Sequence, residues 1–352
     1  MRILHVDSGR EFRGGQDQVR LLVRELAATS DVEQCLLTKR GSELAKRAAG
    51  RRVAVREIPW GLGLDPRSWW RVVVESLAWR PHIIHAHNNH AATMALWARR
   101  FHNWAGPGAA PRFVATRRVV FPLRTGSALR RADAVIAVSR AVNEALVAAG
   151  VPPGEIAIVH DGIDPDEIRS AATPALNVRA TLGLPPGTPL VANVAALEQS
   201  KDQATLIRAA HAARTSRPEL HWLIAGAGPE RRALAAEVGR LDLVDRVHLI
   251  GHVVRADALM HESDVVVMSS RAEGLGSVVL HALALGKPVV ATNAGGLPEI
   301  LPPDRIVPVG DAAALAQKVI DALEHPSPSP LPRQFTASTM AAGVLAVYRS
   351  LV

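Results

Sequence analysis

The sequence predicts an α/β protein with two doubly wound parallel sheets. Short β-branched or apolar runs alternate with amphipathic stretches of helical period along the whole chain, as in repeated strand–helix–strand units. The alternation breaks once, near residues 164–166, where a strand pattern ends in Gly162 and a helical, then proline-containing segment follows. With 352 residues, 48% of them hydrophobic, the chain can bury two cores. We therefore expect two Rossmann-like sheets.

The predicted strands follow one another in chain order in both halves. In the first half they are residues 3–6, 83–86, 113–116, 135–138 and 156–159. In the second half they are residues 190–194, 221–225, 247–250, 265–268 and 289–292. A last helix of apolar period is predicted over residues 337–351.

The segment 273–299 carries the most specific chemistry. Glu273 precedes a glycine-rich loop, which leads into an apolar helix predicted over residues 278–285 and then into the strand 289–292. Glycines let a ligand approach the backbone, and the N–H groups and dipole at the start of a helix attract an anion. An acid beside a phosphate cradle predicts a sugar-nucleotide site, in which Glu273 accepts hydrogen bonds from sugar hydroxyls.

This segment resembles the donor-site motif of retaining GT-B glycosyltransferases, the nucleotide-sugar family called family 4. The family pattern is Glu, seven residues, Glu, then a G-[KR]-P-V-V-A strand and a G-G-x-x-E turn. Glu273 fits the first acid, residues 286–291 read GKPVVA, and residues 295–299 read GGLPE. The second acid holds the nucleotide ribose in the family, but His281 stands at its position here. The resemblance therefore leaves the ribose contact open.

Other matches extend the resemblance over nearly the whole chain. The first strand is followed by Gly14 and Gly15, and residues 81–87, 132–139 and 159–164 are similar to three further family motifs. The resemblance implies a GT-B fold, with two Rossmann-like domains, a cleft between them and a C-terminal crossover helix. It also implies a first domain of residues 1–165 with 333–352, and a second domain of residues 166–332.

The resemblance implies donor-site roles for residues in both halves. Lys201 looks like the lysine that neutralises the donor diphosphate, so Lys201 and Glu273 are the expected catalytic residues, without a metal ion. Alternatively, Lys201 is a solvated loop lysine, and Glu273 only stabilises the N-terminus of the following helix. The alternative for His281 is a histidine that belongs to the core. Further donor contacts are expected at Gly15, Gly226, His252, Val253, Gly274, Leu275, Gly276, Ser277 and His281.

A basic segment in the first half predicts the acceptor side. Six arginines and no acid occur between residues 101 and 132, and guanidinium groups suit phosphate and carboxylate, although such a run is usually a solvated face. Acceptor-binding residues are expected to be His87, Asn88, Arg117 and Arg118. The histidines of the HAHNNH run, residues 85–90, do not predict a metal site, because no nearby carboxylate or cysteine completes one.

Composition limits the partners and the compartment. Residues 1–166 contain 24 Lys and Arg against 16 Asp and Glu, whereas residues 167–352 contain 17 of each. The first half should meet an acidic partner, such as a lipid headgroup, an anionic acceptor or nucleic acid, unless the excess is only an Arg-rich coding bias. Cys35 is the single cysteine, no apolar run approaches the roughly 20 residues of a membrane span, and Met1 enters a strand pattern at once. We expect a cytoplasmic protein in peripheral contact with the inner face of the membrane.

Together these features predict a metal-independent, retaining glycosyltransferase of hexosyltransferase type. It should move a sugar from a nucleotide diphosphate sugar, its co-substrate, to an anionic or membrane-associated lipid or glycan acceptor, without a cofactor. The alternative is a non-catalytic or nucleic-acid-binding GT-B-like protein, motivated by the sequence pI of about 10.6 and by His281. Its basic residues lack the spacing of a known nucleic-acid module, so no nucleic-acid partner is expected. A sugar-phosphate synthase or phosphorylase on the same fold is a third reading.

Overall fold

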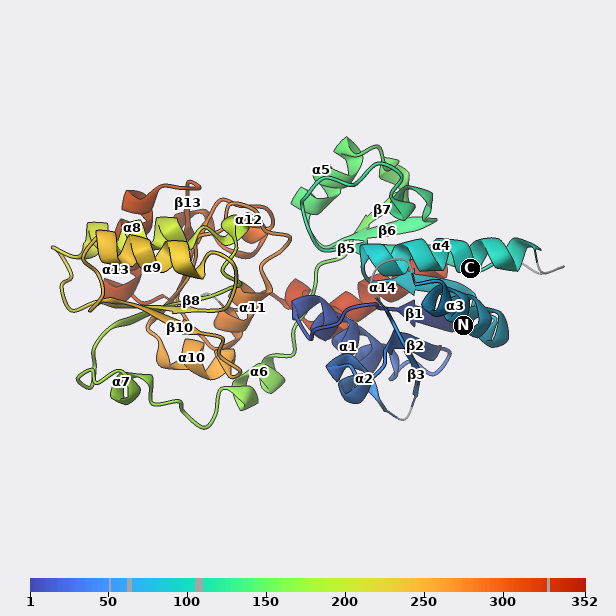
Figure 1. Ribbon diagram of the computed structural model, residues 1–352, viewed down its shortest axis with the longest axis horizontal. Coiled ribbons are helices and arrows are strands. Elements are labelled where there is room, and N and C mark those ends of the chain that lie inside the picture. Colours follow the sequence, from blue (N-terminus) through green and yellow to red (C-terminus); the bar gives the residue numbers. More distant parts are fainter. Residues whose placement is uncertain (51, 62–64, 105–109, 328–329) are drawn as a thin grey trace. The chain divides into compact units, whose positions relative to one another are not determined.

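The computed structural model describes residues 1–50, 52–61, 65–104, 110–327 and 330–352. The chain forms two compact units (Figure 1). Unit 1 consists of Met1–Gly162 with Gln334–Val352, and unit 2 consists of Ile163–Arg333. Unit 2 is thus one continuous segment, whereas unit 1 is assembled from the two ends of the described chain.

Unit 1 contains a seven-stranded parallel sheet in the order β3-β2-β1-β4-β5-β6-β7. Its strands are β1 (Arg2–Val6), β2 (Glu33–Lys39), β3 (Val53–Ile58), β4 (Ile83–Ala86), β5 (Arg112–Arg117), β6 (Ala134–Ala137) and β7 (Ile156–Ile158). Its helices are α1 (Gly14–Leu26), α2 (Glu43–Ala48), α3 (Pro66–Trp79), α4 (Asn89–Trp104), α5 (Arg140–Ala148) and α14 (Ala337–Leu351). The strand order reverses between β1 and β4, which is where such sheets bind ligands.

The C-terminal helix α14 completes the core of unit 1. It packs beside α1, and Met340, Val344 and Tyr348 lie in one apolar cluster with Ile3 of β1 and Ile83 of β4. The Tyr348 side chain is fully buried. Removing α14 would therefore expose the apolar face of the central strands.

Unit 2 contains a six-stranded parallel sheet in the order β10-β9-β8-β11-β12-β13. Its strands are β8 (Leu190–Val194), β9 (His221–Ala225), β10 (Val247–Gly251), β11 (Val265–Met268), β12 (Val289–Thr292) and β13 (Ile306–Val307). Its helices are α6 (Pro165–Ala171), α7 (Val178–Thr181), α8 (Gln203–Ala213), α9 (Arg231–Arg240), α10 (Ala256–Glu262), α11 (Ser277–Ala284), α12 (Leu297–Ile300) and α13 (Ala312–Glu324). The order reverses between β8 and β11, so this unit is also doubly wound.

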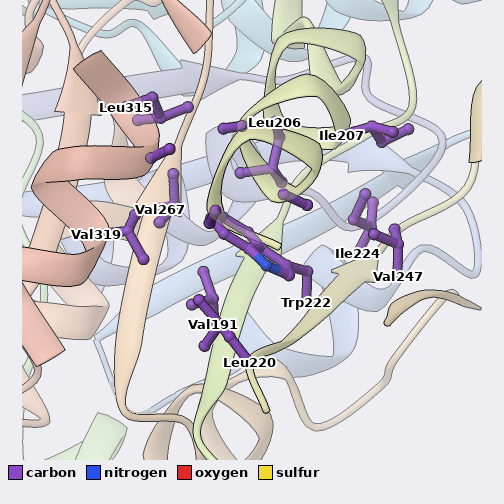
Figure 2. Packing of buried hydrophobic residues seen from close by; sticks show 14 of the residues in the cluster. Val191, Leu206, Ile207, Leu220, Trp222, Ile224, Val247, Val267, Leu315 and Val319 are labelled. Carbon is purple, nitrogen blue, oxygen red and sulfur yellow. The ribbon is translucent and has the colours of Figure 1, made fainter. Parts of the chain in front are cut away.

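Trp222 lies at the centre of the core of unit 2. Its indole is buried beneath Leu206 of α8 and beside Val191 of β8, and α8 packs against α13 (Figure 2). Leu315 and Val319 extend the same cluster onto α13. This core fixes the two central strands, β8 and β11, whose following loops carry Lys201 and Glu273.

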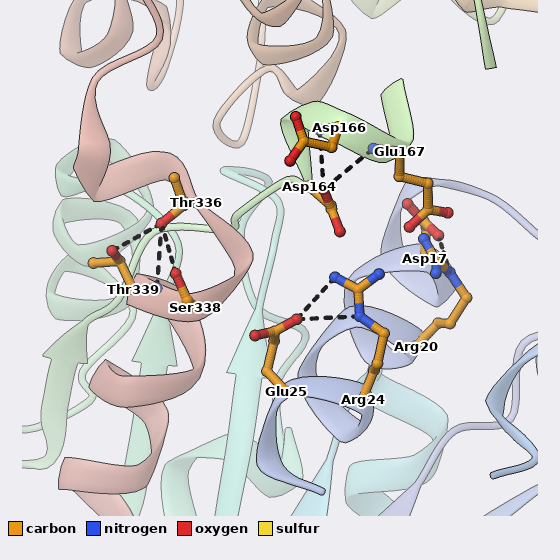
Figure 3. A network of polar contacts seen from close by, with 10 residues as sticks. All are labelled: Asp17, Arg20, Arg24, Glu25, Asp164, Asp166, Glu167, Thr336, Ser338 and Thr339. Atoms are coloured by element: carbon orange, nitrogen blue, oxygen red, sulfur yellow. Dashed lines mark hydrogen bonds and ion pairs between the residues drawn. The ribbon is translucent and has the colours of Figure 1, made fainter. Parts of the chain in front are cut away.

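Polar caps start the helices at the point where the chain passes between the units. Asp164 accepts hydrogen bonds from the backbone N–H groups of Asp166 and Glu167 at 3.0 and 3.2 Å, so it is the N-cap of α6 (Figure 3). Thr336 accepts from the N–H of Thr339 at 3.3 Å and caps α14 in the same way. Such caps typically stabilise a helix by about 1 kcal/mol.

The predicted fold class is confirmed, and the last helix occupies residues 337–351 as expected. The helix expected over residues 278–285 begins and ends one residue earlier, as α11. The structure adds β2, β3 and β13 to the strands named from the sequence. Among the described residues, the helices are all too short or too polar to cross a membrane.

Candidate functional site

Lys201 and Glu273 form an ion pair at the point where the strand order of unit 2 reverses. Lys201 lies in the loop after β8, and Glu273 lies in the loop between β11 and α11. The Nζ atom of Lys201 donates to Oε2 of Glu273 at 2.5 Å, and the side chains are 21% and 12% exposed. The hydroxyl of Ser270 donates to the same oxygen at 3.2 Å. The two predicted catalytic residues are thus brought together.

The two loops that carry this pair are joined by further hydrogen bonds. The Ser269 hydroxyl donates to the carbonyl oxygen of Lys201 at 3.0 Å, and the N–H of Arg271 donates to Ser200 O at 2.8 Å. The Arg271 guanidinium also donates to the Asp202 carboxylate at 2.8 Å. These bonds hold Lys201 and Glu273 in a fixed relation before any ligand binds.

Close backbone packing explains the glycines on both sides of Glu273. Gly295 has φ +53°, and a Cβ atom there would lie 1.7 Å from the carbonyl oxygen of Glu273. Gly276 has φ +104°, and its Cβ would lie 2.5 Å from the Leu297 side chain. The GGLPE turn therefore packs directly on the loop that presents Glu273. Gly274 and Leu275 are buried in this loop, and Ser277 begins α11.

The remaining predicted donor residues of unit 2 separate into two groups. A Cβ atom at Gly226 would lie 1.8 Å from Ala195 O, so the packing of two loops already requires this glycine. Val253 packs against an apolar cluster that includes Leu190, whereas His252 is exposed. Donor contacts at Gly226, His252 and Val253 stay predictions.

His281 has a partner that the sequence did not reveal. Its Nδ1 atom lies 2.8 Å from Oδ1 of Asp257, which belongs to α10, and both side chains are about one-fifth exposed. The Asp257 carboxylate fixes the orientation of the imidazole, so the second nitrogen of the ring is the one left to meet a ligand. His281 is a half-buried surface histidine of α11, not a core histidine.

Arg117 and Arg118 have different surroundings in unit 1, although they are neighbours. Burial lowers the pKa of Arg117, and its guanidinium donates to the carbonyl oxygens of Val119 and Phe121 and to the Asn89 side chain. These contacts use Arg117 to hold its own loop. Arg118 instead donates to Asp161 at 3.0 Å. Burial raises the pKa of Asp161, and the Arg118 charge acts in the opposite direction.

The other predicted acceptor residues lie beside this ion pair, at the end of β4. Asn88 accepts from the Ala91 N–H at 2.9 Å, as a cap of α4 does, and donates to Asp7 at 3.1 Å. His87 is buried, and its carbonyl oxygen accepts from Arg118 at 3.4 Å. Gly15, at the start of α1, lies next to the stem of Arg118. Acceptor binding by His87 and Asn88 stays a prediction, and so does the donor contact expected at Gly15.

The residues that sequence reasoning missed in unit 1 are His5 and Asp7. Both lie at the end of β1, next to β4 in the sheet, and both are buried. The adjacency of the first strand to the fourth follows from the doubly wound order, but no motif around His5 and Asp7 indicated it. His5 is the third member of a cluster with His85 and His87, whereas His90 lies apart on α4.

Two doubly wound parallel α/β units in one chain, with a C-terminal helix that returns to the first unit, define the GT-B fold. The family model "Glycosyl transferases group 1" matches residues 176–339, and "Glycosyltransferase Family 4" matches residues 12–167. Each half of the chain therefore matches a glycosyltransferase family model.

Named relatives agree with this class. A 2-deoxystreptamine glucosyltransferase of Streptomyces kanamyceticus is 29% identical over 221 residues, which are 60% of this chain and 57% of that protein. The match therefore spans little more than half of the length of that relative. A glycosyltransferase from Rickettsia africae has a TM-score of 0.80 at 17% identity and covers 99% of this chain and 98% of its own. Anabaena Alr3699/HepE in complex with UDP-glucose has a TM-score of 0.76 at 20% identity, with 100% and 98% covered.

Proposed function

We propose that this protein transfers a sugar from a nucleotide diphosphate sugar to an acceptor, with retention of the anomeric configuration. The observation that carries the proposal is the Lys201–Glu273 pair at 2.5 Å, at the switch point of unit 2. Ligands of doubly wound sheets bind at that edge. The relative named a glucosyltransferase and the similar fold that binds UDP-glucose favour a hexose on a uridine nucleotide as the first donor to test.

The chemistry needs stabilisation of a leaving diphosphate. Lys201 supplies a positive charge, and the N–H groups of the loop 274–277 at the start of α11 supply donors, so the proposal needs no divalent ion at the donor. Glu273 accepts hydrogen bonds from the sugar hydroxyls and holds the sugar. Glu273 neutralises Lys201 through the ion pair, so binding of a diphosphate would compete for the same ammonium group. The donor phosphate then serves as the base for the acceptor hydroxyl.

The donor proposal is tested by the release of nucleoside diphosphate from a panel of nucleotide sugars, with and without added Mg²⁺. Glu273→Gln should lower turnover by roughly 10²–10³-fold, because the lost contacts act on the reacting sugar. Glu198→Gln is the matched control, since Glu198 is an exposed acid in the same loop as Lys201. Equal activity of the two variants, or a strict need for Mg²⁺, would overturn this mechanism.

On the acceptor side, we propose an anionic or membrane-associated molecule that meets unit 1 at the inner face of the membrane. Two observations support this. The net positive charge of the chain lies in residues 1–166, and unit 1 exposes large apolar side chains at Trp70 of α3 and Phe121 after β5, which are 56% and 51% exposed. Positive charge and exposed apolar side chains are the two features that a peripheral membrane contact requires.

Vesicle flotation tests the membrane part of this proposal. The wild type should float with anionic vesicles at low salt and dissociate as salt is raised. Phe121→Ser should weaken this binding, whereas Val244→Ser, at an equally exposed apolar residue of unit 2, should leave it unchanged. Equal flotation with neutral and anionic vesicles would refute an electrostatic contact.

A further inference from the structure

Three histidines meet on one face of the sheet of unit 1. His5 of β1 and His85 of β4 are directly opposite each other in the parallel ladder, and His87 lies two residues further along, so the three imidazoles share that face. One nitrogen from each ring lies within 4.8 Å of the others. His5 and His85 are fully buried, and His87 is 5% exposed. Neither the donor chemistry nor the acceptor contacts proposed above use this cluster as a unit.

All three imidazoles are buried, and burial favours the neutral form of a histidine side chain. A neutral imidazole carries one lone pair, which is the form that binds a metal ion. Three buried imidazoles without a thiolate or carboxylate suit a late first-row transition ion and not Mg²⁺ or Ca²⁺, which prefer oxygen ligands.

The distances within the cluster agree with shared ligation. His5 Nδ1 and His87 Nε2 are 3.1 Å apart. Two nitrogens bound to one tetrahedral zinc at about 2.0–2.1 Å would lie roughly 3.3–3.4 Å apart. His85 is close enough to bring a third nitrogen in, since its ring centroid is 4.0 Å from that of His87. The three ligand atoms lie within 4.8 Å of one another, so the His85 ring would have to turn toward the other two rings to complete the set.

Groups that surround the cluster resemble the outer shell of a metal site. His85 contacts the Tyr348 hydroxyl through Nδ1 at 2.5 Å and the Thr116 hydroxyl through Nε2 at 2.6 Å, and one of these would remain when the other nitrogen binds a metal. His5 and Gln34 approach each other through buried polar atoms that do not reach the geometry of a full hydrogen bond. Binding of a metal through Nδ1 would place the His5 proton on Nε2, toward Gln34.

The positive charge of Arg118 would repel a cation bound at the histidine cluster. Arg118 donates to the carbonyl oxygen of His87 at 3.4 Å, but its guanidinium is paired with the Asp161 carboxylate at 3.0 Å, whose opposite charge weakens its field at the histidines. We propose that His5, His85 and His87 bind one transition-metal ion of the zinc class, which ties β1 and β4 to α14 through Tyr348. The ion is structural, and the proposal does not depend on the transferase activity.

The test uses the full chain without a histidine tag. The metal content of the purified protein is measured by mass spectrometry, and the metal-free protein is titrated with Zn²⁺ and with Co²⁺. We expect about one equivalent of zinc, a melting temperature that rises with zinc, and a Co²⁺ absorption spectrum with nitrogen ligands in a tetrahedral field. Folded wild type that neither gains stability with zinc nor shows this spectrum would mean a hydrogen-bonded core network, and the proposal would be overturned.

Variants identify the ligands. His87→Gln should weaken zinc binding by more than 10-fold, and Tyr348→Phe by about 10–100-fold, as loss of an outer-shell partner does. His221→Gln is the control, because His221 and His248 form a stacked pair of imidazoles with nitrogens 2.9 Å apart in unit 2, and no third ligand joins them among the described residues. If His87→Gln and His221→Gln bind zinc as the wild type does, the ion lies elsewhere. The wild-type Co²⁺ spectrum decides the question if a variant does not fold.

Discussion

The Lys201–Glu273 pair predicts a measurable coupling energy within unit 2. Lys201→Met, Glu273→Gln and the double variant form a double-mutant cycle. The pair is short, at 2.5 Å, and both side chains are largely shielded from water, at 21% and 12% exposed. Breaking a fully buried pair costs about 3–5 kcal/mol, and a hydrogen bond to a charged group contributes about 1.5–3 kcal/mol. With partial exposure, we expect about 2 kcal/mol for each single variant.

The double variant should lose less than the sum of the two single variants. Replacing Lys201 leaves the Glu273 carboxylate with the Ser270 hydroxyl, at 3.2 Å, as its hydrogen-bond donor. Replacing Glu273 leaves the Lys201 ammonium group without the negative charge that neutralises it. The loss of stability in each single variant includes the cost of leaving the other charge without its partner. The coupling energy should therefore be about 1–2 kcal/mol. Hydrogen exchange of amides in β8 and β11 gives the free energy of opening of unit 2 apart from unit 1. Additive losses would refute the view that these charges neutralise each other.

Two further predictions concern the stability of unit 2. Gly295→Ala should destabilise it by more than about 1–2 kcal/mol in urea unfolding, because φ is +53° and the new Cβ would lie 1.7 Å from Glu273 O. Gly239→Ala, in α9 with open space around it, should instead stabilise by about 0.5–1 kcal/mol, and a loss at Gly239 equal to that at Gly295 would contradict the packing argument. Burial, and then the charges of His248 and Arg246, lower the pKa of His221 to about 4, although Asp245 acts the other way. The unfolded state therefore binds the extra proton between about pH 6.5 and 4, and the stability of unit 2 should fall as the pH falls through this window. His221→Phe should flatten this part of the curve of melting temperature against pH, and an unchanged slope would show that His221 is not the titrating group.

The fold was predictable because its signals are local. Alternating strands and helices, and a glycine at each tight turn, are readable from neighbouring residues, as the match at residues 337–351 shows. The strand β3 was not named because its sequence, VAVREI, mixes charged residues into an edge strand. Its partner β2 was missed with it, although five consecutive residues of β2 are buried.

The details of the sites were less predictable, because they depend on the direction in which each side chain points and on partners that are distant in the sequence. Arg117 and Arg118 are adjacent in a basic run, but successive side chains at a strand end point to opposite sides, so one holds a loop and the other meets Asp161. Asp257 is 24 residues before His281, and no motif joins the two. The HAHNNH run predicts no metal site, because no nearby carboxylate or cysteine completes one, and nothing in the run indicates that His5 of β1 joins His85 and His87.

The discontinuity of unit 1 has a consequence for the order of events during synthesis. Unit 2 is continuous and can reach its full set of contacts as soon as residues 163–333 have left the ribosome. The first 162 residues emerge earlier, yet the strands β1 and β4 lack Met340, Val344 and Tyr348 until α14 follows. Most of unit 1 is thus synthesised first, but its core is completed last. In the interval the apolar face that α14 covers in the folded protein is exposed.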